Sequence, residues 1–585
     1  MAEEKAHNPS EQEIEHKDLE EPIVFEALDT GIKATKEEAR LAAESSQNFK
    51  WDITLYLNLT ALLFCYFAST WGLLVPSSSI PFILQAYPKG ASRAAWIAAA
   101  ATIPNCVIQA FAGELSDILG RKIFLLGGMV LGLVGTIVSS RGDGVEMIIG
   151  GQVLNGCGLT LGYLAIPMVA EIVPKDKRPI LQAVAGGVAG LAILIGPIIQ
   201  GLFIKNDVGG VQEGWRAGFY VAAGFYALTF VLVFFFYHPA PRPVEEDTSM
   251  LSKVLHLDWT GVFMVASGLV LFLVGLEFGG NPYSWASAIV LCTLIIGGIV
   301  LVVFGIWEWK GTKVGLFHHR LFEHRNFMIA VILNVVGGIV LFGGQAYLPQ
   351  EIAILFTQDA VLTGVYSIPF NFGSVLGGVI GGVLMSIFKE AKGIVITSFV
   401  FLLVGVGLMA VMEPHINVAA WFFPTLLMGT AIGAQMTCLY VIVGVCTPNM
   451  LIATAMSLVA SIRALGGSIG IVIFSQIFHH EVSIKWPAQV SKALLEAGLP
   501  GSELEEFIEL AASGATSQLL KLPRVTPALL GVFEAASAQA YADSFRFIWY
   551  SLIPFTALSL ALAFLLQSTK SQMNSQVAAG VRRGH

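Results

Sequence analysis

The sequence predicts an all-α polytopic membrane protein with 14 transmembrane helices. Its 585 residues have a mean hydropathy of +0.72, and only 13% of them are charged, about half of the ~25% that is typical of soluble domains. Fourteen apolar runs are each long enough, at about 20 residues, to cross a bilayer. A charged turn flanked by glycines, residues 113–122, separates two of these runs. Such a turn suits a short loop between packed membrane helices.

The apolar runs fall into two series. The first six lie near 55–76, 94–112, 122–139, 146–170, 180–204 and 216–237. The other eight lie near 259–278, 286–307, 327–349, 361–387, 393–412, 417–445, 452–478 and 545–566. Residues 1–50 hold 13 of the 41 carboxylates, which predicts a disordered cytosolic tail. The net charge of −8 gives no reason to expect a nucleic-acid partner.

Charged loop residues predict the orientation in the membrane. An even number of spans places both termini on one side. With the termini inside, the short inner loops hold thirteen lysines and arginines: Arg121, Lys122, Lys175, Lys177, Arg178, Arg242, Lys253, Lys310, Lys313, Arg320, Arg325, Lys389 and Lys392. The short outer loops hold only five: Lys89, Arg93, Arg141, Lys205 and Arg216. This excess predicts cytosolic termini.

A faint internal repeat predicts the domain organisation. The segment 382–389 follows the tenth span as the segment 113–120 follows the second, with Ser386 in place of Asp117. We therefore expect six-helix bundles at 51–238 and 311–566, a linker with two inserted helices at 239–310, and a cytosolic tail at 567–585. Such repeats are typical of transporters that work by alternating access. In the long outer loop, 479–544, Ser502 and Glu505 form a capping-box pattern that predicts a short surface helix, a structural lid or spacer or else a binding element.

The ten residues from Gly113 to Lys122 match, in order and spacing, the pattern Gly-x-Leu-x-Asp-x-x-Gly-Arg-Lys. This resembles the signature loop of the major facilitator superfamily, so the resemblance implies that superfamily's fold. It also implies gating roles for Gly113, Asp117, Gly120, Arg121 and Lys122. Asp117 and Arg121 are four residues apart, so they can pair with each other or with a neighbouring helix terminus. We expect Asp117→Asn, and separately Arg121→Ala, to abolish transport.

The fifth span contains Gly196, Pro197 and Gly201 in a segment similar to the antiporter motif Gly-x-x-x-Gly-Pro-x-x-Gly-Gly, with Ala192 and Gln200 in place of two glycines. A proline removes one helical hydrogen bond, and small residues four apart let a partner helix approach closely. These three residues are therefore further candidates for conformational control. Generic packing of small residues is the alternative interpretation.

The fourth span departs from the family pattern at Gln152, where an intramembrane arginine is usual. Proton coupling would then depend on other titratable groups in or near the apolar runs. The candidates are Glu171, Glu277 and Glu351, because ionisable groups at membrane depth are usually functional. All three are close to span ends, so solvation at the membrane interface is the alternative.

Arg463 lies near the middle of the thirteenth span, in a segment that resembles part of the fourteen-span drug/proton antiporter families. A buried arginine should face a cavity or a carboxylate, so it is a gating candidate. The polar residues that could line a substrate cavity are Asn105, Gln109, Gln152, Asn334, Gln345, Asn371, Gln435 and Tyr440. Interhelical hydrogen bonding is the alternative for each of them. Because few formal charges occur in these helices, we expect a neutral or weakly polar amphipathic substrate.

Segments 171–178, 315–327 and 541–549 look like those of fungal trichothecene-efflux-type transporters. This resemblance implies a monomeric exporter of secondary metabolites, toxins or drugs, driven by proton antiport, with both termini cytosolic. It implies the plasma membrane, with a vacuolar or vesicle membrane as the alternative. Siderophore-iron importers share the fourteen-span plan and are the alternative function; a non-transporting receptor is a third. The sequence shows no pattern of an enzyme, a metal site or a cofactor site.

Overall fold

The computed structural model describes residues 51–573, except 88–89, 91–92, 175, 211–212, 240–257, 281–282, 313–315, 318–320, 323, 358, 414–416, 448–450, 513–524 and 571–572. The side chains of Asp117 and Ile118 also lie outside the described part. The predicted N-terminal tail and most of the predicted C-terminal tail fall outside it as well. Within the described residues, 14 helices are long and apolar enough to cross a membrane, as the sequence predicts.

The N-terminal half contains six spans. Its helices are α3 (Ile53–Ala86), α4 (Ala94–Leu119), α5 (Arg121–Ser140), α6 (Val145–Tyr163), α7 (Ala165–Ile172), α8 (Arg178–Lys205) and α9 (Gly214–Phe236). Asp52 begins the bundle as the N-cap of α3, with its Oδ1 accepting a hydrogen bond from the Leu55 N–H at 2.8 Å. The fourth span is not one helix, because Leu164 separates α6 from α7.

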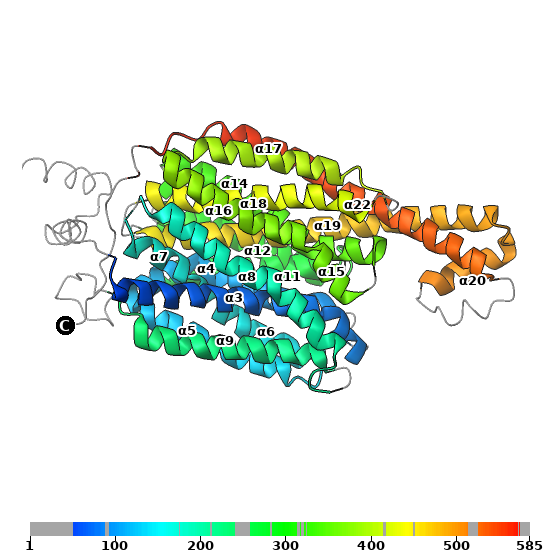
Figure 1. Cartoon of the computed structure of the whole chain (residues 1–585), viewed down its shortest axis with the longest axis horizontal. Helices are drawn as coiled ribbons and strands as arrows, with labels where there is room; N and C mark the ends of the chain where they lie inside the picture. Colours follow the sequence, from blue (N-terminus) through cyan, green and yellow to red (C-terminus); the bar gives the residue numbers. More distant parts are fainter. Residues whose placement is uncertain are drawn as a thin grey trace, which may run out of the picture.

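The C-terminal half repeats this plan. Its spanning helices are α14 (Arg325–Leu355), α15 (Ala360–Tyr366) with α16 (Ile368–Phe388), α17 (Lys392–Met409), α18 (Val418–Cys446), α19 (Ile452–Glu496) and α22 (Pro527–Ala563). Here the tenth span is divided, at Ser367, into α15 and α16. In Figure 1 this half forms the upper part of the bundle and the N-terminal half the lower part.

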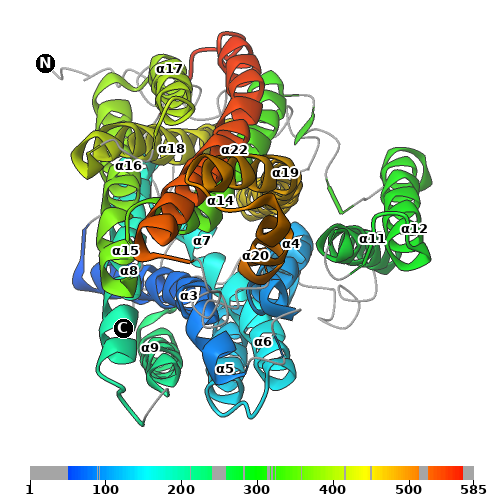
Figure 2. The ribbon, with the colours of Figure 1, turned by 90° about the vertical axis from the view of Figure 1, so that its right-hand side faces the viewer.

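The two inserted helices, α11 (Trp259–Phe278) and α12 (Ala288–Ile306), lie at the side of the bundle beside α4 (Figure 2). Apolar side chains of α11 share a buried cluster with α4 and with Ala464 of α19. The rings of Trp96 and Phe278 are 5.0 Å apart, and the Trp285 indole N–H donates to Gln476 Oε1 at 2.9 Å. The inserted pair therefore contacts both halves where α4 meets α19.

The segment 479–544, predicted as an outer loop, is more helical than the sequence predicts. Helix α19 continues to Glu496 and α22 begins at Pro527, so both project beyond the bundle (Figure 1). The short helix α20 (Gly501–Ala512) packs against them through Trp486, Phe507 and Leu529. It confirms the predicted surface helix, although Ser502 lies inside α20. The sequence did not predict the helical extensions of α19 and α22, because polar residues such as Lys485 interrupt the apolar pattern there.

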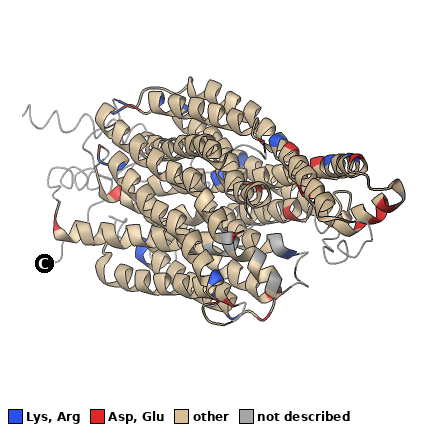
Figure 3. Cartoon of the chain, turned by 45° about the vertical axis from the view of Figure 1, so that its right-hand side comes forward, with Lys and Arg blue, Asp and Glu red and all other residues tan. Residues whose placement is uncertain are grey.

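The molecule thus has two distinct ends. We call the end that carries the α4–α5 and α16–α17 turns, at Gly120 and Lys389, the loop face; the end with the α19–α20–α22 projection is the hairpin face. Charged side chains gather near these ends and on the projection, whereas the helical body is largely uncharged (Figure 3). This distribution is the one that a bilayer around the body requires.

Candidate functional site

A cavity lies between the two halves, near the middle of the bundle. Residues of α3, α4, α6, α7 and α8 line it on one side, and residues of α14, α16, α18 and α19 on the other. Its polar lining consists of Tyr66, Thr70, Asn105, Gln109, Tyr163, Gln182, Gln345, Ser374, Thr437, Tyr440, Ser457 and Arg463. The cavity volume is about 140 Å³, below the roughly 300–1,000 Å³ of drug-sized sites. A larger ligand would need the halves or the lining side chains to move.

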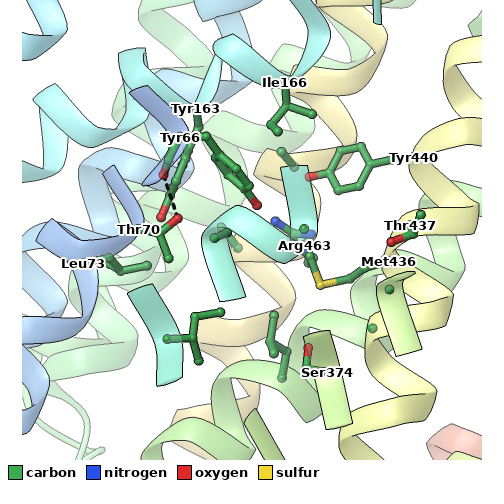
Figure 4. A pocket seen from close by; sticks show the side chains of 18 of the residues that line it. Tyr66, Thr70, Leu73, Tyr163, Ile166, Ser374, Met436, Thr437, Tyr440 and Arg463 are labelled. Carbon is green, nitrogen blue, oxygen red and sulfur yellow. Dashed lines mark hydrogen bonds between the residues drawn. The ribbon is translucent and has the colours of Figure 1, made fainter. Parts of the chain in front are cut away.

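Five of the predicted residues line this cavity: Asn105, Gln109, Gln345, Tyr440 and Arg463. Asn105 and Gln109 project from α4, and Thr160 donates to Asn105 Oδ1 at 3.3 Å. Arg463 lies over the ring of Tyr440, with its guanidinium carbon 5.1 Å from the ring centroid. In Figure 4 it points between the tyrosines of the N-terminal half and Tyr440. The predicted Arg463 thus faces the cavity.

Four predicted cavity residues lie elsewhere, which corrects that part of the sequence interpretation. Gln152 is buried in a network in which its Nε2 donates to Ser139 Oγ at 3.0 Å and its Oε1 accepts from Asn155. Asn334 donates to Ala330 O of its own helix, and Gln435 donates to Leu333 O on α14. Asn371 is half-buried on α16 outside the lining. For the first three, the side chains are engaged in bonds within and between helices, the alternative that the sequence left open.

Arg121 forms a buried ion pair with Glu171, which joins the start of α5 to the end of α7. Only 8% of Arg121 and 2% of Glu171 is exposed. The sequence offered Asp117 or a neighbouring helix terminus as the partner; the structure shows a partner at the end of α7, and the Asp117 side chain lies outside the described residues. Glu171, a predicted proton carrier, is therefore already opposed by a cation, which stabilises its charged form.

Small residues bring the halves together towards the loop face. A Cβ added to Gly113 would lie 2.7 Å from the Ala453 carbonyl oxygen of α19. One added to Gly382 of α16 would lie 2.7 Å from the Pro179 carbonyl oxygen of α8. Arg178, buried at the start of α8, donates to Gly444 O of α18 at 2.5 Å. The halves are therefore in close contact between the cavity and the loop face.

The remaining gating candidates lie outside the cavity lining. Gly120 ends α4 with a φ of +99°, a conformation that glycine adopts without strain. Lys122 donates to Phe234 O at 2.7 Å, which ties α5 to α9. Pro197 lies inside α8, which continues through it, and Gly196 and Gly201 are buried on the same helix. A Cβ on Gly196 would meet the ring of Trp71 at 3.8 Å, an ordinary contact.

The two other predicted proton carriers also lie outside the lining. Glu351 of α14 is 2% exposed, and its Oε2 accepts a hydrogen bond from the Trp549 indole N–H of α22 at 3.2 Å. Glu277, near the end of α11, is half-buried and interacts electrostatically with Tyr347 of α14. Neither carboxylate belongs to the cavity lining.

Several lining residues were missed from the sequence, among them Tyr66, Tyr163, Gln182 and Ser457. Helical spacing carried part of the signal. The α8 residues Gln182, Gly186, Ala189 and Ile193, at intervals of three and four, form one face of that helix and all line the cavity. Combining helical periodicity with polarity would have placed Gln182 beside the predicted residues.

Residues 62–471, more than half of the chain, match the family described as the Major Facilitator Superfamily. The Aspyridones efflux protein of Neocamarosporium betae is 24% identical over 434 residues, which cover 74% of this chain and 76% of that protein. Efflux pump roqT of Penicillium rubens is 26% identical over 416 residues, which cover 69% of this chain and 74% of that pump.

A solved structure has the same fold. The proton:xylose symporter XylE, bound to 6-bromo-6-deoxy-D-glucose, matches with a TM-score of 0.55 at 13% sequence identity, covering 89% of this chain and 98% of the symporter. At that identity the match concerns the fold alone. The expected major facilitator fold is confirmed.

Proposed function

Because the chain belongs to the major facilitator superfamily, and is thus a multi-pass membrane transporter, we propose that it exports a small amphipathic secondary metabolite, toxin or drug in exchange for protons. The observation that carries this proposal is the cavity between the two halves, lined by residues of nine helices. Such a central site, reached alternately from either face, suits alternating access. Efflux is favoured because the two fungal relatives are named for it.

The orientation follows from the excess of lysine and arginine at the loop face. With that face in the cytosol, both termini are cytosolic and the hairpin projection is extracellular, in a plasma membrane. The contacts of Gly113, Gly382 and Arg178 then close the cytosolic side. A conformation closed on that side is the one from which an exporter releases its substrate.

Gating belongs to the loop-face residues in this mechanism. Opening to the cytosol would separate Gly113 from α19 and Arg178 from α18, while the Arg121–Glu171 pair keeps α5 and α7 together. Gly120 shapes the α4–α5 turn, and Lys122 ties α5 to α9. We include Asp117 among the gating residues. Gly196, Pro197 and Gly201 shape α8, which contacts α16 across the seam.

Glu351 is the strongest proton carrier among the three candidates, with Glu277 second. It is buried, and it accepts a hydrogen bond from the neutral Trp549 indole, so protonation would remove the desolvation penalty of its charge. Glu171 would have to release Arg121 first. The energetics allow one proton per molecule. Exporting a neutral compound against a hundredfold gradient requires about 2.7 kcal/mol, and one proton moving down ~100 mV and one pH unit supplies about 3.7 kcal/mol.

A deletion strain tests the direction of transport. Loss of the protein should make a fungal cell hypersensitive to toxins while growth on iron-loaded siderophores stays normal. The opposite pattern would refute export and support siderophore uptake.

Proteoliposomes with an imposed pH gradient test the coupling. Glu351→Gln should abolish gradient-driven accumulation, whereas the matched control Glu413→Gln, at an exposed carboxylate, should transport normally. Gradient-driven transport at the normal rate in Glu351→Gln would assign the proton to another group.

A further inference from the structure

Among the described residues that line the cavity, Arg463 alone carries a charge, and the lining gives it no anionic partner. The described lining contains no aspartate or glutamate. Arg463 is half-buried, and its Nε and Nη1 atoms are buried without a hydrogen-bond partner in the described part of the chain. The contact with the Tyr440 ring attracts the cation but leaves these N–H donors unpaired. A buried guanidinium with unpaired N–H donors is unfavourable unless a bound group accepts hydrogen bonds from it.

Two more unpaired polar atoms belong to the same lining. Gln182 Nε2 on α8 and Ser457 Oγ on α19 are buried and lack a hydrogen-bond partner among the described residues. Gln182 is 7% exposed and Ser457 2%. The amide nitrogen and the two guanidinium nitrogens can only donate, and the serine hydroxyl can donate as well. A ligand that satisfies these unpaired atoms must therefore supply hydrogen-bond acceptors.

Three tyrosines complete the surroundings of Arg463. Tyr66 and Tyr163 line the cavity with it from the N-terminal half, and Tyr440 contacts it from the C-terminal half (Figure 4). The Thr70 hydroxyl donates to the Tyr66 carbonyl oxygen at 2.9 Å, within α3. The rings offer flat apolar surface beside the cationic group. A ligand that uses both would have an anionic head on an aromatic or otherwise apolar body.

We propose that the substrate is an amphipathic organic anion, whose carboxylate or enolate oxygens accept hydrogen bonds from Arg463 and from Gln182 or Ser457. This deepens the proposed export function and rests on it. It departs from the neutral substrate that the low charge of the spans predicts, because the described cavity lining holds one cation and no carboxylate to balance it. Binding from both halves would also let the anion draw α8 and α19 together.

Binding to the purified full-length protein in lipid nanodiscs tests the proposal. The probes are a panel of amphipathic aromatic carboxylic acids and, for each acid, its primary amide, which keeps the size but carries no charge. For the acids of the panel that bind, the wild-type protein should bind the acid at least tenfold more tightly than its amide, because hydrogen bonds to charged groups are worth about 1.5–3 kcal/mol. Arg463→Gln should remove that preference and leave amide binding within about twofold of wild type.

Further variants separate charge from folding. Arg463→Lys keeps the charge but not the planar fork, so it should keep part of the preference. Gln182→Leu should weaken acid binding severalfold. Arg93→Gln is the matched control, because this arginine is exposed and pairs with Glu146 away from the cavity. It should bind like the wild type.

The outcomes are distinct. Equal affinity of the wild-type protein for acid and amide, binding of no acid in the panel, or a preference that survives in Arg463→Gln would each overturn the anion site. If Arg463→Gln does not fold, an unchanged preference in both Arg463→Lys and Gln182→Leu overturns it as well. The binding assay does not depend on a proton gradient or on the direction of transport. Acid binding with failed export in cells would therefore refute the export proposal and leave the anion site intact.

Discussion

The turn between α4 and α5 in the N-terminal half and the turn between α16 and α17 in the C-terminal half occupy equivalent places in the two bundles. Gly120 ends α4 with φ +99°, and Lys389 ends α16 with φ +53°. Seven residues before each of them, Gly113 and Gly382 touch the backbone of the opposite half. The backbone of the degenerate repeat is therefore preserved although its residues are not.

The side chains that hold the two turns differ. After Gly120, Arg121 enters a buried ion pair with Glu171. After Lys389, the half-buried Glu390 instead hydrogen-bonds to Ser568 and to the Thr569 N–H beyond the end of α22. Equivalent geometry can thus be kept by a buried charge pair in one half and by partly solvated hydrogen bonds in the other, and the two should respond very differently to mutation.

The largest effect is expected at the buried pair. Arg121→Ala or Glu171→Ala leaves a buried charge unpaired, so each should lower the free energy of unfolding by about 3–5 kcal/mol and abolish transport. Unfolding titrations in mixed detergent micelles and a proteoliposome assay measure the two effects. Replacing both residues by leucine should recover much of the stability but not the transport. The exposed pair is the control: Arg93→Ala should change stability by less than about 1 kcal/mol. Similar losses at both pairs would contradict the role of burial.

The glycine contacts should behave alike in the two halves. Gly113→Val and Gly382→Val each place a side chain against backbone of the opposite half, so each should cost about 1–3 kcal/mol and hold the loop face open. Spin labels at positions 177 and 389, one in each half, should then move apart in double electron–electron resonance. Gly127→Val is the control, since nothing lies within 4 Å of its added Cβ. An unchanged label distance in both variants would show that these contacts do not close the face.

Substitutions at the two positive-φ residues should have opposite signs. Gly120→Ala forces a side chain into a conformation that L-residues avoid and should destabilise by about 1 kcal/mol. Lys389→Gly relieves the same kind of strain and should stabilise by up to about 1 kcal/mol. The comparison uses the same unfolding titration. Gly393→Ala, inside α17 with open space around it, should be neutral or slightly stabilising. Destabilisation by Lys389→Gly would mean that a contact of the Lys389 side chain stabilises the fold by more than the backbone strain costs.

The smallest effect is expected at Glu390. Its hydrogen bonds to Ser568 and Thr569 are partly solvated, so Glu390→Gln should change the free energy of unfolding by less than about 1 kcal/mol. Transport should continue at a rate close to that of the wild type. A loss comparable to that of Glu171→Ala would erase the distinction between the two turns.

Sequence patterns predicted the spans well and the cavity only in part. A long apolar run has few alternatives to a membrane helix, so hydropathy located all fourteen spans. The roles of polar residues inside those runs were harder to predict, because each role depends on the rotation and position of its helix. Gln109 on α4 faces the seam between the halves, whereas Gln152 on α6 points into packing against α5. Nothing local to either residue separates the two cases.

The sequence by itself determined the number of spans, the repeat that places Gly113 and Gly382 alike, and a glycine at position 120 that permits positive φ. These properties depend on hydrophobicity and on local backbone sterics, which each segment carries alone. Only the tertiary structure decided that Arg121 pairs with Glu171, that Arg463 stands in the cavity without an anion, and that Gln182 joins it there. Those outcomes depend on which distant helices meet, and on how much water each polar group loses when they do.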